Sequence, residues 1–418
     1  MKAGSCFEGQ LYLWLSFGCL DLLINLEVVG RVCNMMRKEM HIETKLIHAG
    51  EPIPRFGGAV TLPIFQSSTF QYHGQDHYDK LKYIRMNNTP NHVALHQKLA
   101  SLENADAALV TSSGMAAITT TLLALLSPGE HFLAQDCLYG GTIDFINSDF
   151  KPLGISVDYI DGNKPDTWAK QLKAETRVIY VETITNPLMA VADLKAAAAF
   201  ARNHGLISMI DNTFASPVNF RPAEWGFDLS LHSGTKYLNG HSDIVAGAVI
   251  GRDDLIHKIA HKLIHLGGSL DPHACFLLHR GMKTLAVRMK YQNESALAIA
   301  EFLANHPVVE KVNYPGLETC TGHAHALKLL NGFGGLISFE IKGNAADADR
   351  FIERTRLPIC APSLGGVESL ITRPATTSHS GMSRADRNAI GISDRLIRLS
   401  VGLESTQDLI DDFDRALS

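Results

Sequence analysis

The chain has 418 residues, 45% of them hydrophobic, and this length predicts two to three domains with ample apolar cores. Its 38 Lys and Arg residues nearly balance 43 Asp and Glu residues, for a net charge of −5, and this balance argues against a nucleic-acid partner. The 7 cysteines include no CxxC pair, which is typical of free thiols in a cytoplasmic protein.

The first forty residues differ from the rest of the chain. Residues 11–29 are apolar but are interrupted by three polar or charged side chains. A signal peptide needs one short unbroken apolar run and a spanning helix needs about 20 apolar residues, and the stretch fits neither pattern. We therefore expect residues 1–40 to be a poorly ordered or wrongly assigned extension, with Met35, Met36 or Met40 as the functional start. A membrane-associated segment is the alternative, and we expect no membrane partner.

From about residue 96, short apolar runs alternate with amphipathic stretches. The apolar runs predict strands at 107–111, 131–135, 178–182, 206–211, 229–232 and 245–250. Segments between them, such as 116–126 and 194–203, have helical patterning. This alternation is typical of a mostly parallel sheet with helices on both faces. Such a sheet binds its ligands at the carboxyl ends of its strands, so we look for functional residues there.

The pattern changes after the last of these strands. Residues 253–265 and 282–305 predict long helices, and residues 334–341 predict a further strand. Helical patterning returns at 345–354 and 405–417. We therefore predict a second, smaller α/β domain at the C-terminal end, joined to the first by a long helix.

The first candidate site element is Ser-Ser-Gly-Met at residues 112–115, which closes a strand and opens a helix. The free N–H groups of Gly114 and Met115, at the positive end of the helix, could bind a phosphate. Small residues also suit any tight turn, so the motif alone is weak. No GxGxxG or GxxxxGK[ST] motif is present, which argues against a dinucleotide site or a P-loop.

Two later strands end in residues with acid–base chemistry. Asp211 ends the strand 206–211, where it could pair with a cationic ring nitrogen or cap the next helix. Lys236 follows another strand and is flanked by two hydroxyl groups, those of Ser233 and Thr235, which could bind a phosphate. A lysine can form a Schiff base with an aldehyde, and burial beside other cations makes it nucleophilic. The alternative is a lysine that points to solvent.

Tyr139 follows the strand 131–135, where its ring could stack on a flat cofactor or be an ordinary half-buried side chain. An aldehyde-binding lysine, a carboxylate for a ring nitrogen, a phosphate cradle and an aromatic ring are together what pyridoxal 5'-phosphate (PLP) requires. The combination therefore predicts a PLP site.

From about residue 44 to residue 417 the chain resembles the Cys/Met-metabolism family of PLP enzymes, which includes cystathionine β-lyase, cystathionine γ-lyase, cystathionine γ-synthase and methionine γ-lyase. Four motifs carry this resemblance, and they span residues 113–117, 211–214, 233–243 and 396–404. The resemblance implies a fold-type I PLP-dependent transferase with a large, mostly parallel, seven-stranded sheet domain and a smaller C-terminal α/β domain. The implied divisions are a N-terminal arm (41–95), a PLP-binding domain (96–290) and a C-terminal domain (291–418).

The resemblance also implies roles for the residues that match its motifs. Lys236 would bind the cofactor's aldehyde and move the substrate's α-proton, and Asp211 would pair with the pyridine nitrogen. Tyr139 would stack on the ring and assist protonation of the leaving group. The phosphate would be held by Gly114, Met115, Ser233 and Thr235.

Three further residues would bind the substrate. Arg398 would clamp its α-carboxylate, because the arginine fork binds a carboxylate bidentately. Ser363 would help to frame this site, and Asn186 would contact the cofactor's hydroxyl or the same carboxylate.

Tyr83 and Arg85 match a family motif that reaches the phosphate of the neighbouring subunit. The resemblance therefore implies a homo-oligomer, an obligate dimer within a tetramer. The family often has Asn-Pro-Thr just after this motif, whereas residues 88–90 read Asn-Thr-Pro here.

Three positions bear on the reaction within the family. Gly141 stands where methionine γ-lyases often have a cysteine. Pro362 stands where γ-specific members tend to have a glutamate and a β-lyase has an aromatic residue, so only the lack of the glutamate weighs against γ-chemistry. Asp144 stands where γ-lyase and γ-synthase have an arginine, and its charge would attract the distal ammonium of L-cystathionine. We therefore favour β-elimination of this sulfur-containing amino acid to homocysteine, pyruvate and ammonia. The alternatives are γ-elimination of cystathionine or methionine and γ-replacement.

A rival pattern is His257, His261 and His265, which repeat every four residues and would share one helix face. No carboxylate or cysteine joins them at ligand spacing, and the lysines between them indicate a solvated face. We therefore expect no metal site.

Overall fold

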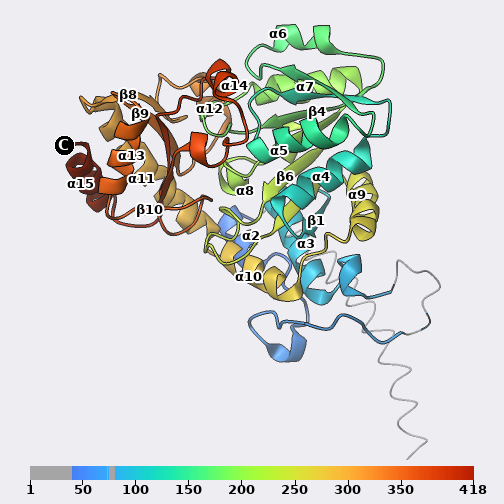
Figure 1. Ribbon diagram of the computed structural model, residues 1–418. Helices are drawn as coiled ribbons and strands as arrows, with labels where there is room; N and C mark the ends of the chain where they lie inside the picture. Colours follow the sequence, from blue (N-terminus) through green and yellow to red (C-terminus); the bar gives the residue numbers. More distant parts are fainter. Residues whose placement is uncertain (1–39, 73, 75–80) are drawn as a thin grey trace, which may run out of the picture.

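The computed structural model describes residues 40–72, 74 and 81–418, so the expectation for residues 1–40 falls almost wholly outside the described part. Two sheets organise this part, a seven-stranded sheet and a five-stranded sheet, and Figure 1 shows them side by side in separate lobes. Within the described ranges, no helix is long and apolar enough to cross a membrane.

The large sheet confirms the mostly parallel α/β prediction. Its strand order is β1-β7-β6-β5-β4-β2-β3, and β7 is the strand that runs antiparallel to both of its neighbours. The strands are β1 (Ala107–Thr111), β2 (His131–Gln135), β3 (Ser156–Ile160), β4 (Thr176–Glu182), β5 (Ile207–Asp211), β6 (Leu229–Ser233) and β7 (Gly247–Gly251). The sequence analysis missed β3, an edge strand whose residues are mostly half-buried or exposed.

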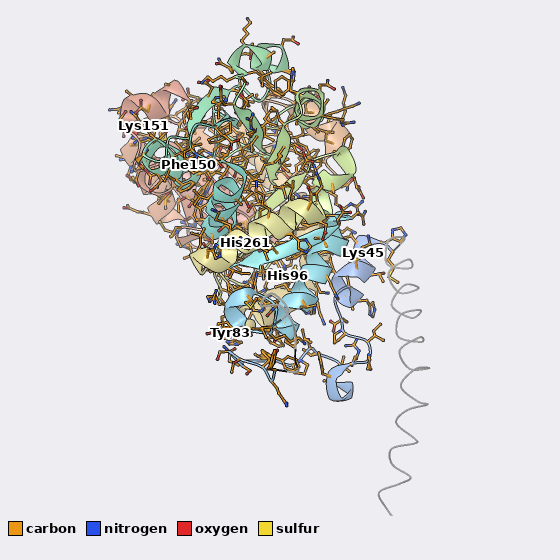
Figure 2. All side chains as sticks on the ribbon, turned by 90° about the vertical axis from the view of Figure 1, so that its right-hand side faces the viewer. Lys45, Tyr83, His96, Phe150, Lys151 and His261 are labelled. Atoms are coloured by element: carbon orange, nitrogen blue, oxygen red, sulfur yellow. The ribbon has the colours of Figure 1, made fainter. Side chains whose placement is uncertain are left out.

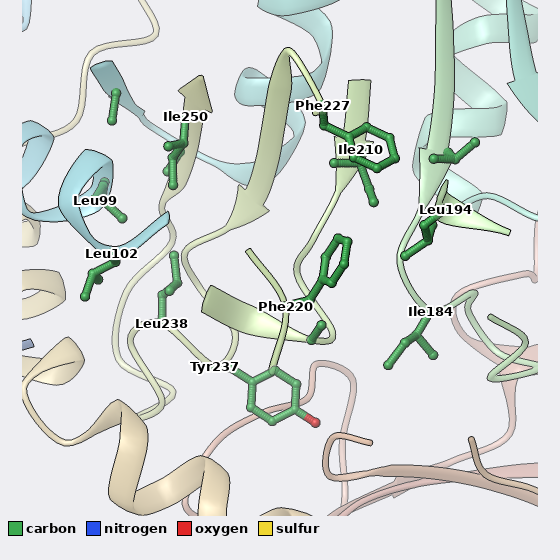
Figure 3. Packing of buried hydrophobic residues seen from close by; sticks show 14 of the residues in the cluster. Leu99, Leu102, Ile184, Leu194, Ile210, Phe220, Phe227, Tyr237, Leu238 and Ile250 are labelled. Atoms are coloured by element: carbon green, nitrogen blue, oxygen red, sulfur yellow. The ribbon is translucent and has the colours of Figure 1, made fainter. Parts of the chain in front are cut away.

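Helices cover both faces of the large sheet. Alternate strand residues point to opposite faces, so neighbouring residues of one strand pack against different helices. On β5, Met209 packs into the cluster around α4 and α9, whereas Ile210 packs into the cluster around α3 and α7. Figure 3 shows part of the cluster that contains Ile210 and Phe220. Tyr237 belongs to the same cluster and lies below the strands in this view. The helices of this lobe are α3 (Pro90–Glu103), α4 (Gly114–Leu125), α5 (Gly140–Phe145), α6 (Pro165–Trp168), α7 (Leu194–His204), α8 (Ser216–Asn219) and α9 (Asp253–Leu266).

Two helices follow α9, whereas the sequence analysis predicted one helix there, over residues 282–305. α10 (Pro272–Met282) ends at that residue, and α11 (Leu285–Asn305) then carries the chain into the second lobe. Arg288, in the first turns of α11, bonds across this break. Its guanidinium donates to the carbonyl oxygens of Tyr237 at 2.8 Å and Gly281 at 3.0 Å. The turn between the two helices is thereby tied to the segment that follows β6.

The second lobe confirms the smaller C-terminal α/β domain. Its strands run in the order β10-β11-β12-β9-β8, and β10 and β11 are its parallel pair. The strands are β8 (Val309–Asn313), β9 (Leu336–Ile341), β10 (Ile359–Cys360), β11 (Leu370–Thr372) and β12 (Leu396–Ser400). The helices are α12 (His323–Leu329), α13 (Ala345–Arg354), α14 (Arg384–Ala389) and α15 (Thr406–Leu417). Side chains of α11, α13 and α15 pack with those of the sheet in one apolar cluster.

An N-terminal arm precedes these lobes. It begins with α2 (Ile42–His48), which packs against α3, and continues to Tyr83 at the lower end of the molecule in Figure 2. The Asn-Thr-Pro sequence at residues 88–90 is accommodated because Pro90 occupies the first turn of α3, where a proline costs no hydrogen bond. The side chain of Asn88 accepts from the N–H of Tyr83 at 3.0 Å and so closes the turn before the helix.

Candidate active site

A cavity of about 740 Å³ lies at the carboxyl edge of the large sheet, where β4, β5 and β6 end in Glu182, Asp211 and Ser233. The large lobe lines it with Ser113, Gly114, Met115, Ile118, Tyr139, Glu182, Ile184, Asn186, Asp211, Thr213, Phe214, Ser233, Thr235, Lys236 and Val245. The C-terminal lobe adds Pro362, Ser363, Leu364, Thr377, Ser378 and Arg398. The cavity therefore lies between the two domains, at the edge where parallel sheets place their ligands.

Lys236 lies three residues beyond the end of β6, and its amine points across to the C-terminal lobe. Its Nζ donates to the Oγ of Ser363 at 2.7 Å. Burial and the nearby Arg398 guanidinium lower the pKa of Lys236 from 10.5 to about 8. A substantial fraction of this amine is therefore neutral near physiological pH, which is the form that attacks an aldehyde or accepts a proton.

Asp211 is the last residue of β5, and its carboxylate faces the cavity. It accepts a hydrogen bond from the backbone N–H of Thr213 at 2.9 Å. Burial raises the pKa of Asp211 above its ordinary value, although the hydrogen bonds from Thr213 and the nearby His232 act in the opposite direction. This carboxylate is suited to a cationic partner such as a protonated ring nitrogen.

A candidate anion site lies at the first turn of α4. Ser113 caps the helix by accepting from the N–H of Ala116 at 2.9 Å, and Gly114 and Met115, whose N–H groups have no partner within the helix, line the cavity. A Cβ on Gly114 would lie 2.9 Å from that of Ser233, and glycine is therefore needed for this close approach. The helix terminus and the Ser233 hydroxyl thus form one cradle for a phosphate.

Arg398 is the third residue of β12 and is only 5% exposed. Its Nη1 donates to Oδ1 of Asn186 at 3.1 Å and its Nη2 to the carbonyl of Ser363 at 3.1 Å. Burial lowers the pKa of Arg398 to about 10, so the group still carries its charge at neutral pH. A buried, oriented guanidinium is the side chain best suited to bind a substrate carboxylate.

Ser363 joins the lysine and the arginine. Its hydroxyl accepts from Lys236 and its carbonyl from Arg398, and it adopts a φ of 87° in the left-handed region. A serine in this region is uncommon, and such backbone conformations are concentrated at functional sites. The C-terminal lobe therefore brings a strained residue to the centre of the cavity.

Tyr139 stands at the start of α5 and remains 41% exposed. Its backbone N–H donates to Oε1 of Glu182 at 2.6 Å. The sequence analysis did not single out Glu182, Thr377 or Ser378, although all three line the cavity. Glu182 ends a strand in the same way as Asp211, and this position was the one signal that could have identified it.

The described residues fit PLP. One cavity holds an amine of lowered pKa, a buried carboxylate, a helix N-terminus where Gly114 closely approaches Ser233, and a tyrosine ring. These are the groups required for an aldehyde, a pyridine nitrogen, a phosphate and an aromatic ring.

Three predicted site residues lie outside this set of lining residues. Asp144 is exposed on α5, where its carboxylate accepts from the Ser148 hydroxyl at 3.3 Å, and its contact with a distal ammonium stays a prediction. Tyr83 and Arg85 belong to the arm, and the Arg85 guanidinium donates to the carbonyl of Ile264 at 3.3 Å. Their contact with a neighbouring subunit also stays a prediction.

The histidines on α9 have no metal-site geometry. His257, His261 and His265 are all exposed, and His257 contacts the backbone of Asp253 in the preceding turn. Over residues 40–72, 74 and 81–418, no group of three or more His, Cys, Asp or Glu side chains could hold a metal ion.

Residues 43–418 match the family model described as Cys/Met metabolism PLP-dependent enzyme. The chain is 42% identical over 377 residues to the cystathionine beta-lyase of Lactococcus lactis subsp. cremoris (strain MG1363), which covers 90% of this chain and 98% of that protein. It is 40% identical over 380 residues to the cystathionine gamma-lyase of Sus scrofa, covering 90% and 93% of the two chains. Among solved structures, cystathionine gamma synthase from Xanthomonas oryzae pv. oryzae, in complex with aminoacrylate and cysteine, has a TM-score of 0.87 at 39% identity and covers 90% and 98%.

Proposed function

Because the chain belongs to the family of Cys/Met metabolism PLP-dependent enzymes, we propose that it cleaves L-cystathionine by β-elimination and releases homocysteine, pyruvate and ammonia. The observation that carries the proposal is the meeting of the Lys236 amine, the Arg398 guanidinium and the Asp211 carboxylate in one cavity. The relatives named cystathionine beta-lyase support the choice of a carbon–sulfur bond as the one broken.

The cofactor would be held by the side chains already described. Lys236 would bind its aldehyde, Asp211 would pair with its pyridine nitrogen, and the first turn of α4 with Ser233 and Thr235 would hold its phosphate. The chemistry that PLP supplies when bound is withdrawal of electrons from the substrate's Cα.

Arg398 binds the α-carboxylate of the amino acid and thereby fixes which substituents of Cα point to Lys236. Its orientation is set in advance by Asn186 and Ser363, so little conformational freedom is lost when the carboxylate binds. Because the site is buried, the attraction between the two charges is stronger than in water.

Lys236 moves the proton. Its lowered pKa lets the Nζ accept the α-proton near neutral pH, and the Ser363 hydroxyl 2.7 Å away gives the amine a fixed position. Tyr139 also lines the cavity, and its hydroxyl is the group we assign to protonating the sulfur of the leaving homocysteine.

Two residues weigh against parts of the γ-cleaving group. Pro362 lines the cavity without the glutamate that γ-specific members tend to have at this position, although it also lacks the aromatic residue of a β-lyase. Gly141 lacks the cysteine that is common in methionine γ-lyases, which argues against a specialised methionine γ-lyase. The relatives named cystathionine gamma-lyase and L-methionine gamma-lyase make γ-elimination the second candidate.

Product analysis separates the two candidates. Purified, PLP-loaded protein is incubated with L-cystathionine, and the keto acid and thiol are identified by mass spectrometry. Pyruvate with homocysteine is the expected result. Cysteine with 2-oxobutyrate would replace β-elimination with γ-elimination and leave the assignment of the cofactor site unchanged.

We also propose that the protein works in the cytoplasm as a homo-oligomer, a tetramer built from two dimers. The arm carries exposed apolar side chains at Ile53, Val60 and Tyr72, which a second copy could cover. Cys137, Cys275, Cys320 and Cys360 are free in the described part of the chain, which supports a reducing compartment.

A further inference from the structure

Glu182 is a buried carboxyl group in the cavity with no part in the reaction as described above. It ends β4 directly beside Asp211, its partner in the register of the parallel strands, and it is 4% exposed. Its own backbone N–H donates to Oε1 of Gln135 at 3.0 Å, which fixes the strand end from the β2 side. Burying a carboxyl group is costly, so its contacts call for an explanation.

The Glu182 side chain joins two separate segments of the site. Its Oε1 accepts from the backbone N–H of Tyr139 at 2.6 Å, and its carboxyl also accepts from the backbone of Asn186. Asn186 in turn accepts from Arg398 at 3.1 Å. One continuous set of hydrogen bonds therefore runs from the ring-stacking tyrosine to the carboxylate-binding arginine.

The charge state of Glu182 fits this role. Burial and the neighbouring Asp211 carboxylate raise the pKa of Glu182 well above its usual range. A neutral Glu182 leaves Asp211 as the anion of the pair, and two adjacent carboxylates could not both be ionised there at low cost.

We propose that Glu182 is a positioning residue that holds Tyr139 and Asn186 in register, so that the cofactor-stacking ring and the substrate-binding Arg398 are set together. It acts through hydrogen-bond acceptance by its carboxyl group and needs no negative charge. The proposal goes beyond the proposed reaction, since it concerns cofactor and amino-acid binding for any substrate of the site.

A matched pair of variants, Glu182→Gln and Glu182→Ala, tests whether Glu182 acts as a hydrogen-bond acceptor or through a negative charge. Glutamine keeps the carbonyl acceptor at nearly the same shape, whereas alanine removes the acceptor for the backbone N–H groups of Tyr139 and Asn186. For Glu182→Ala we expect the dissociation constant for PLP, titrated into apo-protein by fluorescence, and the KM for L-cystathionine each to rise about tenfold or more. For Glu182→Gln we expect both to stay within about threefold of the wild type, with the visible circular dichroism of the bound cofactor retained.

Controls separate this effect from general loss of stability. Glu130 lies at the opposite edge of the sheet, before β2, and pairs with Arg177, so Glu130→Gln and Glu130→Ala should leave both constants unchanged. If Glu182→Ala does not fold, Gln135→Met is the second variant, because it removes only the acceptor for the Glu182 backbone N–H. In this variant the dissociation constant for PLP and the KM for L-cystathionine should both rise.

Two results would overturn the proposal. Equal losses in Glu182→Gln and Glu182→Ala would mean that an ionised carboxylate is required, and unchanged constants in Glu182→Ala would mean that the residue positions nothing. If the wild type does not cleave L-cystathionine, the proposed reaction fails, while the PLP titration still reports on Glu182.

Discussion

The amine of Lys236 depends for its reactivity on two neighbours from the other lobe. Ser363 holds the Nζ at 2.7 Å, and the charge of Arg398 adds to burial in disfavouring the protonated amine. The arginine that we propose as the carboxylate clamp therefore also lowers the pKa of the lysine. Neither effect can be deduced from the sequence around Lys236, because both partners lie more than a hundred residues away.

The first prediction concerns pH. Only a neutral Nζ attacks an aldehyde, so the rate at which apo-protein captures PLP should rise with pH and reach half its maximum near pH 8, the pKa of Lys236. Arg398→Met removes the positive charge and should move this midpoint to higher pH. Stopped-flow absorbance measures the rate. A wild-type midpoint near 10.5, the ordinary pKa of a lysine, would contradict the prediction.

A second prediction concerns the fork of Arg398. Arg398→Lys keeps the charge but loses the paired N–H geometry, and one charge-assisted contact contributes about 1.5–3 kcal/mol. We expect the KM for L-cystathionine to rise roughly 10- to 100-fold with a smaller change in kcat. Arg395→Lys is the control, because Arg395 precedes the same strand but pairs with Glu310 and Glu340, neither of which lines the cavity. Equal KM values in the two variants would argue against a carboxylate clamp.

At this scale the sequence predicted the residues with distinctive chemistry. Asp211, Lys236 and Arg398 were each predicted, and the cavity brings them together with Gly114 and the other phosphate-binding candidates. Glu182 was missed because its role depends on accepting backbone N–H groups, which no side-chain pattern reveals. Asp144 was also predicted, and it is exposed on α5 outside the residues that line the cavity, so its contact with a distal ammonium stays a prediction.

The elements explain why distant residues converge. β1, β4, β5 and β6 all end at one edge of the large sheet, so hydrophobic runs that are easy to recognise in the sequence place their last residues around one cavity. β3 was missed because an edge strand buries little and lacks a long apolar run. The sequence analysis also missed α10 (Pro272–Met282) and began the following helix at 282, whereas α11 begins at Leu285.

A third prediction tests the contact between α5 and the loop after β11. A Cβ on Gly140 would lie 2.3 Å from the carbonyl oxygen of Ser378, so Gly140→Ala must push this loop away from the cavity. We expect about 1–3 kcal/mol of lost stability and a lower kcat/KM, because Ser378 lines the site. Gly381→Ala, in the same loop with open space around it, should behave as wild type. Thermal unfolding and steady-state kinetics of both variants provide the comparison, and a wild-type Gly140→Ala would contradict this packing.

In the whole molecule, the site belongs to both lobes. The C-terminal lobe supplies Arg398, Ser363 and Ser378, and α11 connects it to the sheet lobe. Sequence patterns predicted two α/β domains but could not predict how they face each other, since that arrangement depends on packing between side chains far apart in the chain. Thr377 and Ser378 could therefore be found only in the structure.

A fourth prediction tests whether the arm acts on a neighbouring subunit. Lys236→Ala and Arg85→Ala should each be inactive alone, but a mixed dimer would contain one site with both residues intact if Arg85 acts in trans. Random mixing should restore roughly a quarter of wild-type activity, because half of the dimers are mixed and each has one of two sites. Activity is measured after unfolding and refolding the two variants together. A mixture that stays inactive would place Arg85 in its own subunit's site, and an Arg85→Ala variant that is active alone would place Arg85 outside the site.

The most direct test of the account is to locate the cofactor on the chain. PLP-loaded protein is reduced with borohydride, which fixes the link between the cofactor and a lysine, and the digested peptides are sequenced by mass spectrometry. We predict a phosphopyridoxyl group on Lys236 and its complete absence in Lys236→Ala. A modification on another lysine, or an unmodified Lys236 in protein that retains its cofactor, would contradict the assignment of this cavity as the active site.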